Sequence, residues 1–425
     1  MFKKKVLIKG PVLSRSGYGE QARCILKALR SREDLFDIHL VNIPWGRTGQ
    51  QSEVTEETEY IRENLQRTAT LIQQNNNQAA FDISVQVTIP NEFQPMAPIN
   101  IGYTAGIETT KVAPQWIAKA NEAVNKIITV SNHGKKVFEQ TKYDVHDQEG
   151  NEHKGWGLQV PVESINYPVR VSEPNEVNID FKTSKNFITI SQWGPRKNLE
   201  NTIKWFVEKF RDDPDVGLVV KTNTASDTVI DREFTQGRMQ ALLDSFGEGK
   251  CSVYLIHGEL PAGGLAWLYE HPTMKALINI GHGEGFGLPL FEAACHGLPL
   301  ITITWSGQMD FICKPNKKGK LVPMVIPVDY NIKQVQKEVV WKNVIVEDAE
   351  WAYAKESSFK RALQESLDKE KHFREKAKSL QKYILDEFSH DKIHKQFVDS
   401  VLGFDSSLIQ PSETEENEEQ VLEFE

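Results

Sequence analysis

The chain has 425 residues, of which 39% are hydrophobic, 26% charged and 9% aromatic. This length predicts two or three domains, and this composition excludes a wholly disordered or collagen-like chain. The net charge is −9, but the last fifteen residues carry seven acids and no base, which leaves −2 for the rest. A body so close to neutral argues against a sequence-independent nucleic-acid coat protein, because such proteins displace counterions with many Lys and Arg side chains.

The four cysteines, Cys24, Cys251, Cys295 and Cys313, lie far apart and form no Cys-x-x-Cys pair. They are too few for a disulfide scaffold, so we expect free thiols in a reducing cytoplasm. The apolar run within 1–11 is too short for a signal peptide and indicates a first strand. No stretch approaches the ~18 apolar residues of a membrane span, so we expect a soluble, cytoplasmic protein.

The first part of the chain alternates apolar, β-branched runs with helical patterns. A helix is predicted around Gln21 to Leu29, between the first two strands. This order is typical of a parallel sheet with helices on both faces, and it predicts a Rossmann-like domain over 1–175. The predicted strands are 5–9, 36–43, 81–85, 99–104 and 126–131.

A polar segment without periodicity, 170–185, contains Pro174 and predicts a domain boundary. A second series of strands follows it and predicts another doubly wound domain over 176–388. Those strands are 187–191, 216–222, 251–256, 275–280, 298–303 and 322–328.

The C-terminal part is charged and helical from about Ser357 to Val401, with apolar residues three or four apart. This pattern predicts one or two amphipathic helices. We expect 389–405 to form a terminal helix that crosses back to the first domain. The acidic segment 406–425 is predicted to be a disordered tail.

The strongest local signal is 278–312, where a glycine-rich turn separates a strand from a helix that begins near Pro289. Glycines there let backbone N–H groups approach an anion, and the helix dipole favours phosphate. Glu284 and Glu292 lie before and within that helix, so both can face one ligand. The alternative is an ordinary turn with two surface acids.

In this stretch two glutamates are separated by seven residues. It resembles the Glu, seven residues, Glu signature of retaining GT-B glycosyltransferases, particularly glycosyltransferase family four. The resemblance implies that Glu284 contacts hydroxyls of the donor sugar and that Glu292 binds the nucleotide ribose. It also implies that the amides near Gly287 and Leu288 meet the diphosphate.

A second loop, in 188–206, places Arg196 and Lys197 between a strand and a helix. In the family, an Arg and a Lys of this loop neutralise the leaving diphosphate. Lys197 matches the Lys, but Ser191 or Gln192 occupies the usual Arg position. Arg196, or Lys221 at the end of the next strand, is our candidate for the second cation. The alternative is a solvated pair of surface cations.

The first domain offers a glycine loop with Gly17 and Gly19, which resembles the family's loop across the cleft from the donor phosphates. The segment 100–140 resembles the acceptor-facing part of the family. Many relatives have a His where this chain has Thr104 to Gly106, so that role does not transfer. We predict Thr104 on the acceptor side and Glu108 as an acceptor or sugar contact, the alternative for Glu108 being a charge at a helix N-terminus.

Two His-Gly-Glu triplets, 257–259 and 282–284, lack the His spacing of a zinc site, so we predict no metal ligands and interpret them as strand-end turns facing the cleft. His133 is interpreted as a residue of a capping turn. The two Trp residues between Tyr330 and Tyr353 are interpreted as packing residues.

Together these patterns predict an α/β protein with the GT-B fold, two facing Rossmann-like domains and C-terminal helices. By the resemblance, it transfers a sugar from a nucleoside diphosphate sugar to an acceptor hydroxyl, with retention and without a bound cofactor. Alternatives are a noncatalytic nucleotide-sugar or nucleic-acid binding protein and an NAD-dependent oxidoreductase. The oxidoreductase is disfavoured because the first loop lacks a Gly-x-Gly-x-x-Gly pattern.

The expected acceptor follows from a general similarity to phage-encoded glycosyltransferases, some of which modify hydroxymethylated DNA bases. We therefore expect 5-hydroxymethylcytosine in DNA, in a host cytoplasm, and keep lipid, polysaccharide or protein acceptors as alternatives. Val421, Leu422 and Phe424 form an apolar tip on the acidic tail. This tip suggests docking on a partner protein, the alternative being a solvated tail.

Overall fold

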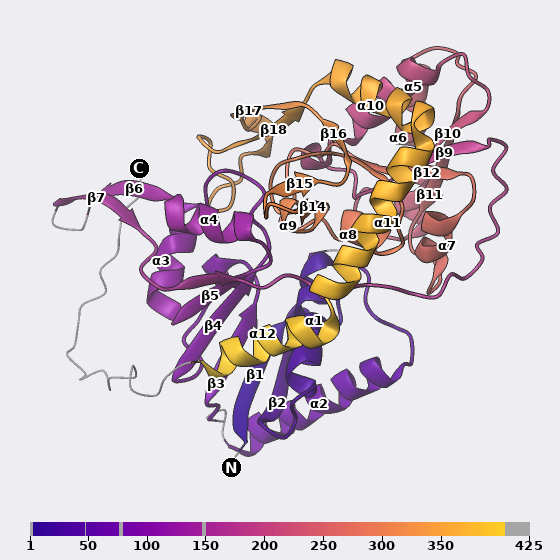
Figure 1. Ribbon diagram of the computed structural model, residues 1–425. Coiled ribbons are helices and arrows are strands. Elements are labelled where there is room, and N and C mark those ends of the chain that lie inside the picture. The colour runs from indigo at the N-terminus through magenta and orange to yellow at the C-terminus, as the bar shows by residue number, and fades with distance from the viewer. Residues whose placement is uncertain (1–2, 47, 76–79, 147–149, 404–425) are drawn as a thin grey trace.

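The computed structural model describes residues 3–46, 48–75, 80–146 and 150–403. Two six-stranded sheets, in which every neighbouring pair is parallel, form the centres of two α/β domains (Figure 1). Helices cover both faces of such sheets because the strands are apolar on both sides. In β1 (Lys4–Gly10), for example, Val6, Leu7 and Ile8 are all buried.

The first sheet has the order β2-β1-β3-β4-β5-β8, so the strand order reverses between β1 and β3. Its other strands are β2 (Phe36–Asn42), β3 (Ile83–Val87), β4 (Ile99–Thr104), β5 (Lys126–Thr129) and β8 (Val162–Ser164). The helices of this domain are α1 (Gly17–Arg30), α2 (Glu56–Gln74), α3 (Pro114–Ala123) and α4 (Asn132–Gln140), with a 3₁₀ turn η1 (Pro90–Glu92). A hairpin of β6 (Lys142–His146) and β7 (Glu152–Gly157) lies beside α4.

The second sheet has the order β11-β10-β9-β12-β13-β16, and it reverses between β9 and β12. Its strands are β9 (Lys185–Ile190), β10 (Val216–Thr222), β11 (Ser252–His257), β12 (Met274–Asn279), β13 (Leu300–Ile303) and β16 (Ile326–Val328). Ligands of open parallel sheets bind at the carboxyl ends of the strands that flank such a reversal. The strand order therefore directs attention to the loops after β9 and β12.

The second domain contains η2 (Pro195–Lys197), α5 (Leu199–Phe210), α6 (Val229–Asp244), α7 (Gly264–Glu270), α8 (Leu288–Cys295) and α9 (Met309–Ile312). Two short hairpins follow, β14 (Cys313–Pro315) with β15 (Leu321–Pro323), and β17 (Tyr330–Gln334) with β18 (Glu350–Ala354), the latter enclosing η3 (Lys337–Val339). The predicted strand 322–328 is thus two strands, of which β16 alone joins the sheet.

The C-terminal part forms three helices, α10 (Glu356–Asp368), α11 (Glu370–Glu387) and α12 (His390–Leu402), where the sequence predicts one or two. The prediction was wrong because the breaks, at Lys369 and at Phe388 to Ser389, contain neither Gly nor Pro. Helix α12 packs against α1 of the first domain (Figure 1). The rings of Tyr103 and Phe397 lie 5.3 Å apart there.

The connection between the sheets runs from Ile165 to Ser184 without helix or strand. The predicted domain limit near residue 175 lies within it, and the limits of the domains stay predictions. The predicted tail, 406–425, lies outside the described residues. Among the described helices, none combines the length and the apolar character that a membrane crossing needs.

Candidate active site

A cleft of ≈ 1000 Å³ lies between the two domains, at the carboxyl ends of their strands. The second domain contributes the loops after β9 and β12 and the end of β10. The first domain contributes the loops after β1 and β4. The predicted site residues that line this cleft are Gly17, Glu108, Arg196, Lys197, Lys221, Glu284, Gly287, Leu288 and Glu292.

The glycine loop after β12 brings the domains together. A Cβ at Gly283 would overlap with the carbonyl oxygen of Glu108, and one at Gly285 with that of Ala105. Gly287 has a φ of +96°, which favours glycine, and it caps the N-terminus of α8. The glycines therefore serve two purposes, the close approach of the first domain and the turn into α8.

Glu284 is buried, with 5% of its surface exposed, yet it is fully paired. Its carboxylate accepts hydrogen bonds from Lys197 Nζ at 2.6 and 2.7 Å and from Asn279 Nδ2 at 3.0 Å. Arg196 Nη1 lies 3.3 Å from it. Burial opposes the charge, but the two cations and these bonds lower the pKa of Glu284 to about 2. The carboxylate is therefore ionised throughout the neutral range.

Arg196 connects the two faces of the cleft. Its Nη1 donates to the carbonyl oxygen of Gly283 at 2.7 Å, and its Nη2 lies 3.4 Å from Glu108 of the first domain. Burial and the neighbouring Arg196 charge lower the pKa of Lys197. In this structure Arg196 and Lys197 thus balance the charges of Glu108 and Glu284.

Lys221 differs from the other basic side chains of the cleft. Arg15, Arg170, Arg196 and Lys197 each form ion pairs, whereas Lys221 has no ion pair to a carboxylate of the described residues. Burial lowers its pKa. The adjacent Ser191 amide donates to the Lys221 carbonyl oxygen at 3.1 Å, and the buried Ser191 hydroxyl has no hydrogen-bond partner in the described part of the chain. Lys221 and Ser191 line the same cleft as the N-terminus of α8, and a cation, a hydroxyl and helix amides that share one cleft suit an anion.

Glu292 lies on α8 and is paired with Arg170, whose Nη1 is 3.2 Å from Glu292 Oε1. Burial raises the pKa of Glu292 in spite of the Arg170 charge. Arg170 was not predicted as a site residue, because it lies at the start of the polar segment that the sequence indicates as a boundary.

Gly19 and Thr104 do not line the cleft but support it. A Cβ at Gly19 would overlap with the carbonyl oxygen of Ser14, so Gly19 permits the tight loop after β1. Thr104 Oγ1 lies 2.8 Å from the hydroxyl of Tyr18, which accepts hydrogen bonds from the amides of Ala105 and Gly106.

The cleft also has an aromatic edge that the sequence did not predict. The rings of Tyr18 and Trp45 lie 4.2 Å apart, and both residues line the cleft. Burial raises the pKa of Tyr18 to about 12, so its hydroxyl stays neutral. The sequence indicates the two Trp residues between Tyr330 and Tyr353 as packing residues. Trp351, on β18, is buried, but Trp341 is 62% exposed and lines the cleft. The packing prediction is therefore wrong for Trp341.

The two His-Gly-Glu triplets place Glu259 and Glu284 on the cleft, while their histidines hold the loops. His282 Nδ1 donates to the Ala352 carbonyl oxygen at 2.7 Å, and His257 Nε2 lies 2.8 Å from Asp231. In the described ranges, no cluster of three His, Cys, Asp or Glu side chains could hold a metal ion.

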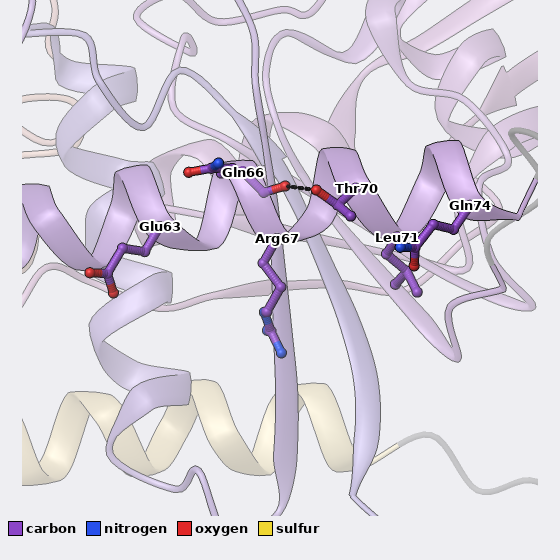
Figure 2. A pocket seen from close by; sticks show the side chains of 6 residues that line it. All are labelled: Glu63, Gln66, Arg67, Thr70, Leu71 and Gln74. Atoms are coloured by element: carbon purple, nitrogen blue, oxygen red, sulfur yellow. Dashed lines mark hydrogen bonds between the residues drawn. The ribbon is translucent and has the colours of Figure 1, made fainter.

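His133 contacts a backbone carbonyl, since its Nε2 lies 3.1 Å from the Thr109 oxygen, and burial lowers its pKa to about 4. A separate pocket of ≈ 440 Å³ runs along α2 and is lined by side chains of that helix alone (Figure 2). A pocket formed by one helix surface lacks the convergent groups of a binding site.

No protein-family model matches the sequence, and no curated protein matches it. Solved structures of other proteins do resemble this structure. HepE of Anabaena in complex with UDP-glucose is 11% identical, with a TM-score of 0.55 and coverage of 93% of this chain and 99% of that chain. Sucrose-phosphate synthase of Thermosynechococcus elongatus is 13% identical, with a TM-score of 0.57 and coverage of 94% and 98%. The UDP-forming α,α-trehalose-phosphate synthase of Burkholderia xenovorans is 11% identical, with a TM-score of 0.54 and coverage of 94% and 99%. At these identities the likeness concerns the fold, and the chain has the predicted GT-B fold.

Proposed function

We propose that this protein is a glycosyltransferase that moves a sugar from a nucleoside diphosphate sugar to an acceptor hydroxyl. The observation that carries the proposal is that Lys221, which has no ion pair in the described residues, lines the same cleft as Ser191 and the α8 N-terminus, at the reversal of the second sheet. Further support is the binding of UDP-glucose by HepE and the formation of UDP by the trehalose-phosphate synthase, which share the fold.

The donor is assigned along the second-domain face of the cleft. The diphosphate is held by Lys221, Ser191 and the amides near Gly287 and Leu288. Glu292 accepts hydrogen bonds from the ribose hydroxyls. Glu284 orients the sugar hydroxyls, with Lys197 beside it at 2.6 Å. All of these residues line the cleft, which supports the proposal, and the order is the one that the resemblance to family four implies.

In the proposed reaction the bond between the anomeric carbon and the phosphate oxygen breaks, and a bond to the acceptor oxygen forms on the same face of the sugar. The acceptor proton passes to a phosphate oxygen of the leaving diphosphate. Charge grows on that diphosphate in the transition state, so fixed cations there accelerate transfer. In the proposal Lys197 and Arg196 supply such cations, and their place on the loop beside Glu284 supports this role.

The acceptor is assigned to the first-domain face, at Tyr18, Trp45 and Glu108, with Trp341 of the second domain. An aromatic edge suits a flipped base, which supports 5-hydroxymethylcytosine in DNA as the acceptor. The charges give less support, since Arg15 on this face is paired with Glu259. Polysaccharide, lipid and protein acceptors therefore belong in the same test.

The test is a panel of nucleoside diphosphate sugars against duplex DNA with and without 5-hydroxymethylcytosine, an oligosaccharide, a lipid and a peptide, read by mass spectrometry. We expect a mass gain of one sugar on one acceptor class with one donor. The matched control is Glu284→Gln, which keeps the shape of the side chain and removes its charge. Donor binding without turnover on any acceptor would favour the noncatalytic binding protein.

The tail proposal concerns residues outside the described ranges. We propose that 421–424 dock on a partner protein, on the support of three apolar residues, Val421, Leu422 and Phe424, in an acidic segment. Truncation after Ser407 should leave transfer unchanged and abolish recovery of the partner in a pull-down. Equal recovery by the truncated protein would reject the idea.

A further inference from the structure

Arg170 occupies an unusual place, between the domains and against the candidate ribose carboxylate. One guanidinium nitrogen lies 3.2 Å from Glu292 Oε1 on α8, and another lies 3.1 Å from Glu20 Oε2 on α1. The side chain therefore bridges two carboxylates that belong to different domains. Planar guanidinium groups suit this task because their donors point in fixed directions.

The chain just before Arg170 is anchored at two points. The Val169 amide donates to the Phe388 carbonyl oxygen at 2.8 Å, at the end of α11. The ring of Tyr167 lies 5.1 Å from that of Phe286, in the loop before α8. Arg170 is thus anchored next to the loop and helix that carry the candidate donor site.

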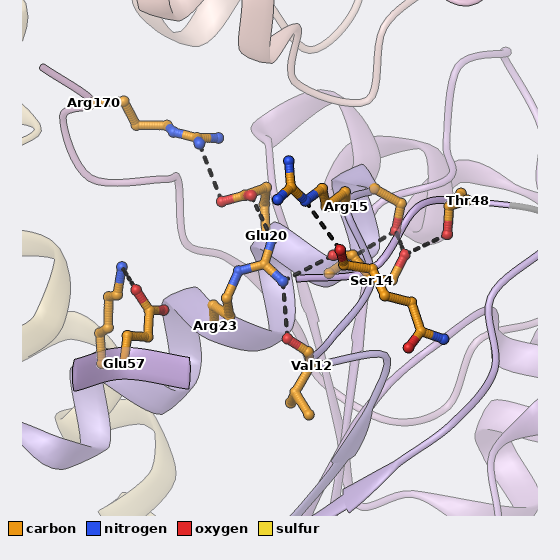
Figure 3. Close-up of polar contacts among 12 residues, drawn as sticks. Val12, Ser14, Arg15, Glu20, Arg23, Thr48, Glu57 and Arg170 are labelled. Atoms are coloured by element: carbon orange, nitrogen blue, oxygen red, sulfur yellow. Dashed lines mark hydrogen bonds and ion pairs between the residues drawn. The ribbon is translucent and has the colours of Figure 1, made fainter. Parts of the chain in front are cut away.

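The contacts continue from Glu20 into the glycine loop of the first domain (Figure 3). Glu20 forms an ion pair with Arg23, whose Nη1 donates to the carbonyl oxygens of Val12 and Ser14 at 2.9 and 2.8 Å. The side chain of Arg23 is 5% exposed. A continuous chain of charged contacts therefore joins the loop after β1 to Glu292.

We propose that Arg170 is the positioning residue of the ribose subsite, and that it sets the Glu292 carboxylate while tying it, through Glu20 and Arg23, to the first-domain loop. The inference rests on the proposed function, because it takes Glu292 as the ribose ligand. Arg170 holds the Glu292 carboxylate through Oε1, and the same carboxylate accepts the hydrogen bond from the ribose in the proposal. Since the bridge spans both domains, it also fixes the position of Glu292 relative to the first-domain loop.

Loss of Arg170 should change the pKa of Glu292, an effect that is not expected if Arg170 only supports the fold. The cation opposes the burial that raises the pKa of Glu292, so its removal raises this pKa further. The carboxylate is then protonated over a wider pH range, and within that range it binds ribose hydroxyls less well. The ionisable groups that act on Glu292 are Arg170, Glu20, Lys221, His296, Tyr269 and Cys295.

The experiment compares two nucleotides by calorimetry between pH 5.5 and 8.5. One is the nucleoside diphosphate that the parent protein binds best, and the other is its 2′,3′-dideoxy analogue. We expect Arg170→Met to weaken binding of the ribonucleotide roughly tenfold at pH 7 and that of the analogue less than about threefold. We also expect ribonucleotide affinity of the variant to recover as the pH rises, with a higher midpoint than in the parent.

Three further variants keep the test sharp. Arg170→Lys retains the charge and should bind the ribonucleotide better than Arg170→Met but less well than the parent. An ammonium can pair with one carboxylate but cannot bridge two as a planar guanidinium does. Glu20→Gln should leave ribonucleotide binding less affected than Arg170→Met, because it spares the contact with Glu292. Arg361→Met, which removes a surface arginine paired with Asp329 outside the cleft, is the matched control. Thermal melting confirms that each variant is folded.

The outcomes separate the two ideas. Equal losses for both nucleotides, or an unchanged pH midpoint in folded Arg170→Met, would overturn the role of Arg170 and leave the glycosyltransferase proposal standing. If the parent protein binds no nucleoside diphosphate at all, the proposed function itself is refuted, and the role of Arg170 with it.

Discussion

The two faces of the cleft differ in the kind of chemistry they present. The second-domain face holds Lys197, Lys221 and Glu284 at the ends of adjacent strands. The first-domain face presents the neighbouring, tilted rings of Tyr18 and Trp45, and its basic side chain, Arg15, is already paired. One face is organised by charge and the other by aromatic surface.

This difference indicates a division of work. A diphosphate carries a fixed charge, so cations and helix amides recognise it whichever sugar and base are attached to it. Aromatic rings recognise planar or apolar ring faces and impose little charge requirement. We therefore expect mutations on the second-domain face to change donor binding and turnover, and mutations on the first-domain face to change the acceptor KM.

The largest effect is expected for Lys197→Ala. Removing this cation should lower kcat about 100- to 1000-fold, with a smaller change in nucleotide affinity, because charge on the leaving diphosphate grows towards the transition state. Single-turnover rates at saturating donor measure this, with the exposed Lys204→Ala of α5 as the control. Rates equal to those of the parent would show that Lys197 serves only to neutralise Glu284.

A somewhat smaller effect is expected for Lys221→Met. Loss of the one unpaired cation among the described lining residues should weaken nucleoside diphosphate binding by roughly 10- to 100-fold, as for a lost hydrogen bond to a charged group. Nucleoside binding without phosphate should stay the same. Calorimetry with both ligands checks this, and equal affinities for the diphosphate in parent and variant would place the phosphate elsewhere in the cleft.

On the opposite face, Trp45→Ala should raise the acceptor KM about tenfold and leave the donor KM unchanged, since an aromatic ring of the cleft is lost and no charge is altered. Trp45→Phe retains a ring and should recover most of the loss. Initial rates with each substrate varied in turn separate the two constants. An increase confined to the donor KM would reverse the assignment of the two faces.

The smallest effect concerns pH and stability. The pKa of Glu284 is lowered to about 2 in the folded protein, so its stabilising contribution is present above its usual pKa of 4.5 and is lost as the pH falls towards 2. The difference in free energy of unfolding between the parent and Glu284→Gln should thus narrow between pH 6 and pH 3.5. Urea titrations at both values measure it, and a constant difference would mean that the Lys197 pair does not lower this pKa.

The sequence predicted the second-domain face better than the first. Strands rich in β-branched residues and glycine turns fixed where Glu284 and Lys197 lie, because both follow buried parallel strands whose ends meet. The contacts that complete the site cross between distant segments. Arg170 lies in a polar connection and Trp341 in a hairpin loop, and no local pattern distinguishes either from an ordinary surface residue.

Two of the predicted site residues do not line the cleft, for a similar physical reason. Gly19 and Thr104 lie next to cleft residues in the chain, but their own contacts are with Ser14 and Tyr18. The sequence pattern identified the correct loops, and the direction of each side chain was then decided by tertiary packing. Tyr18 lies between the two glycines of the first loop, and an aromatic residue at that position could have been predicted to line the cleft.

The central claim is that the second-domain face binds a nucleoside diphosphate through Glu292 and Lys221. The most direct measurement is calorimetric titration of the parent protein and Glu292→Ala with UDP, GDP, ADP, CDP and dTDP. Our account predicts that at least one nucleotide binds the parent and that binding is clearly weaker in the folded variant, because the carboxylate that accepts hydrogen bonds from the ribose is lost. Binding of none of them, or equal affinity in Glu292→Ala, would contradict it.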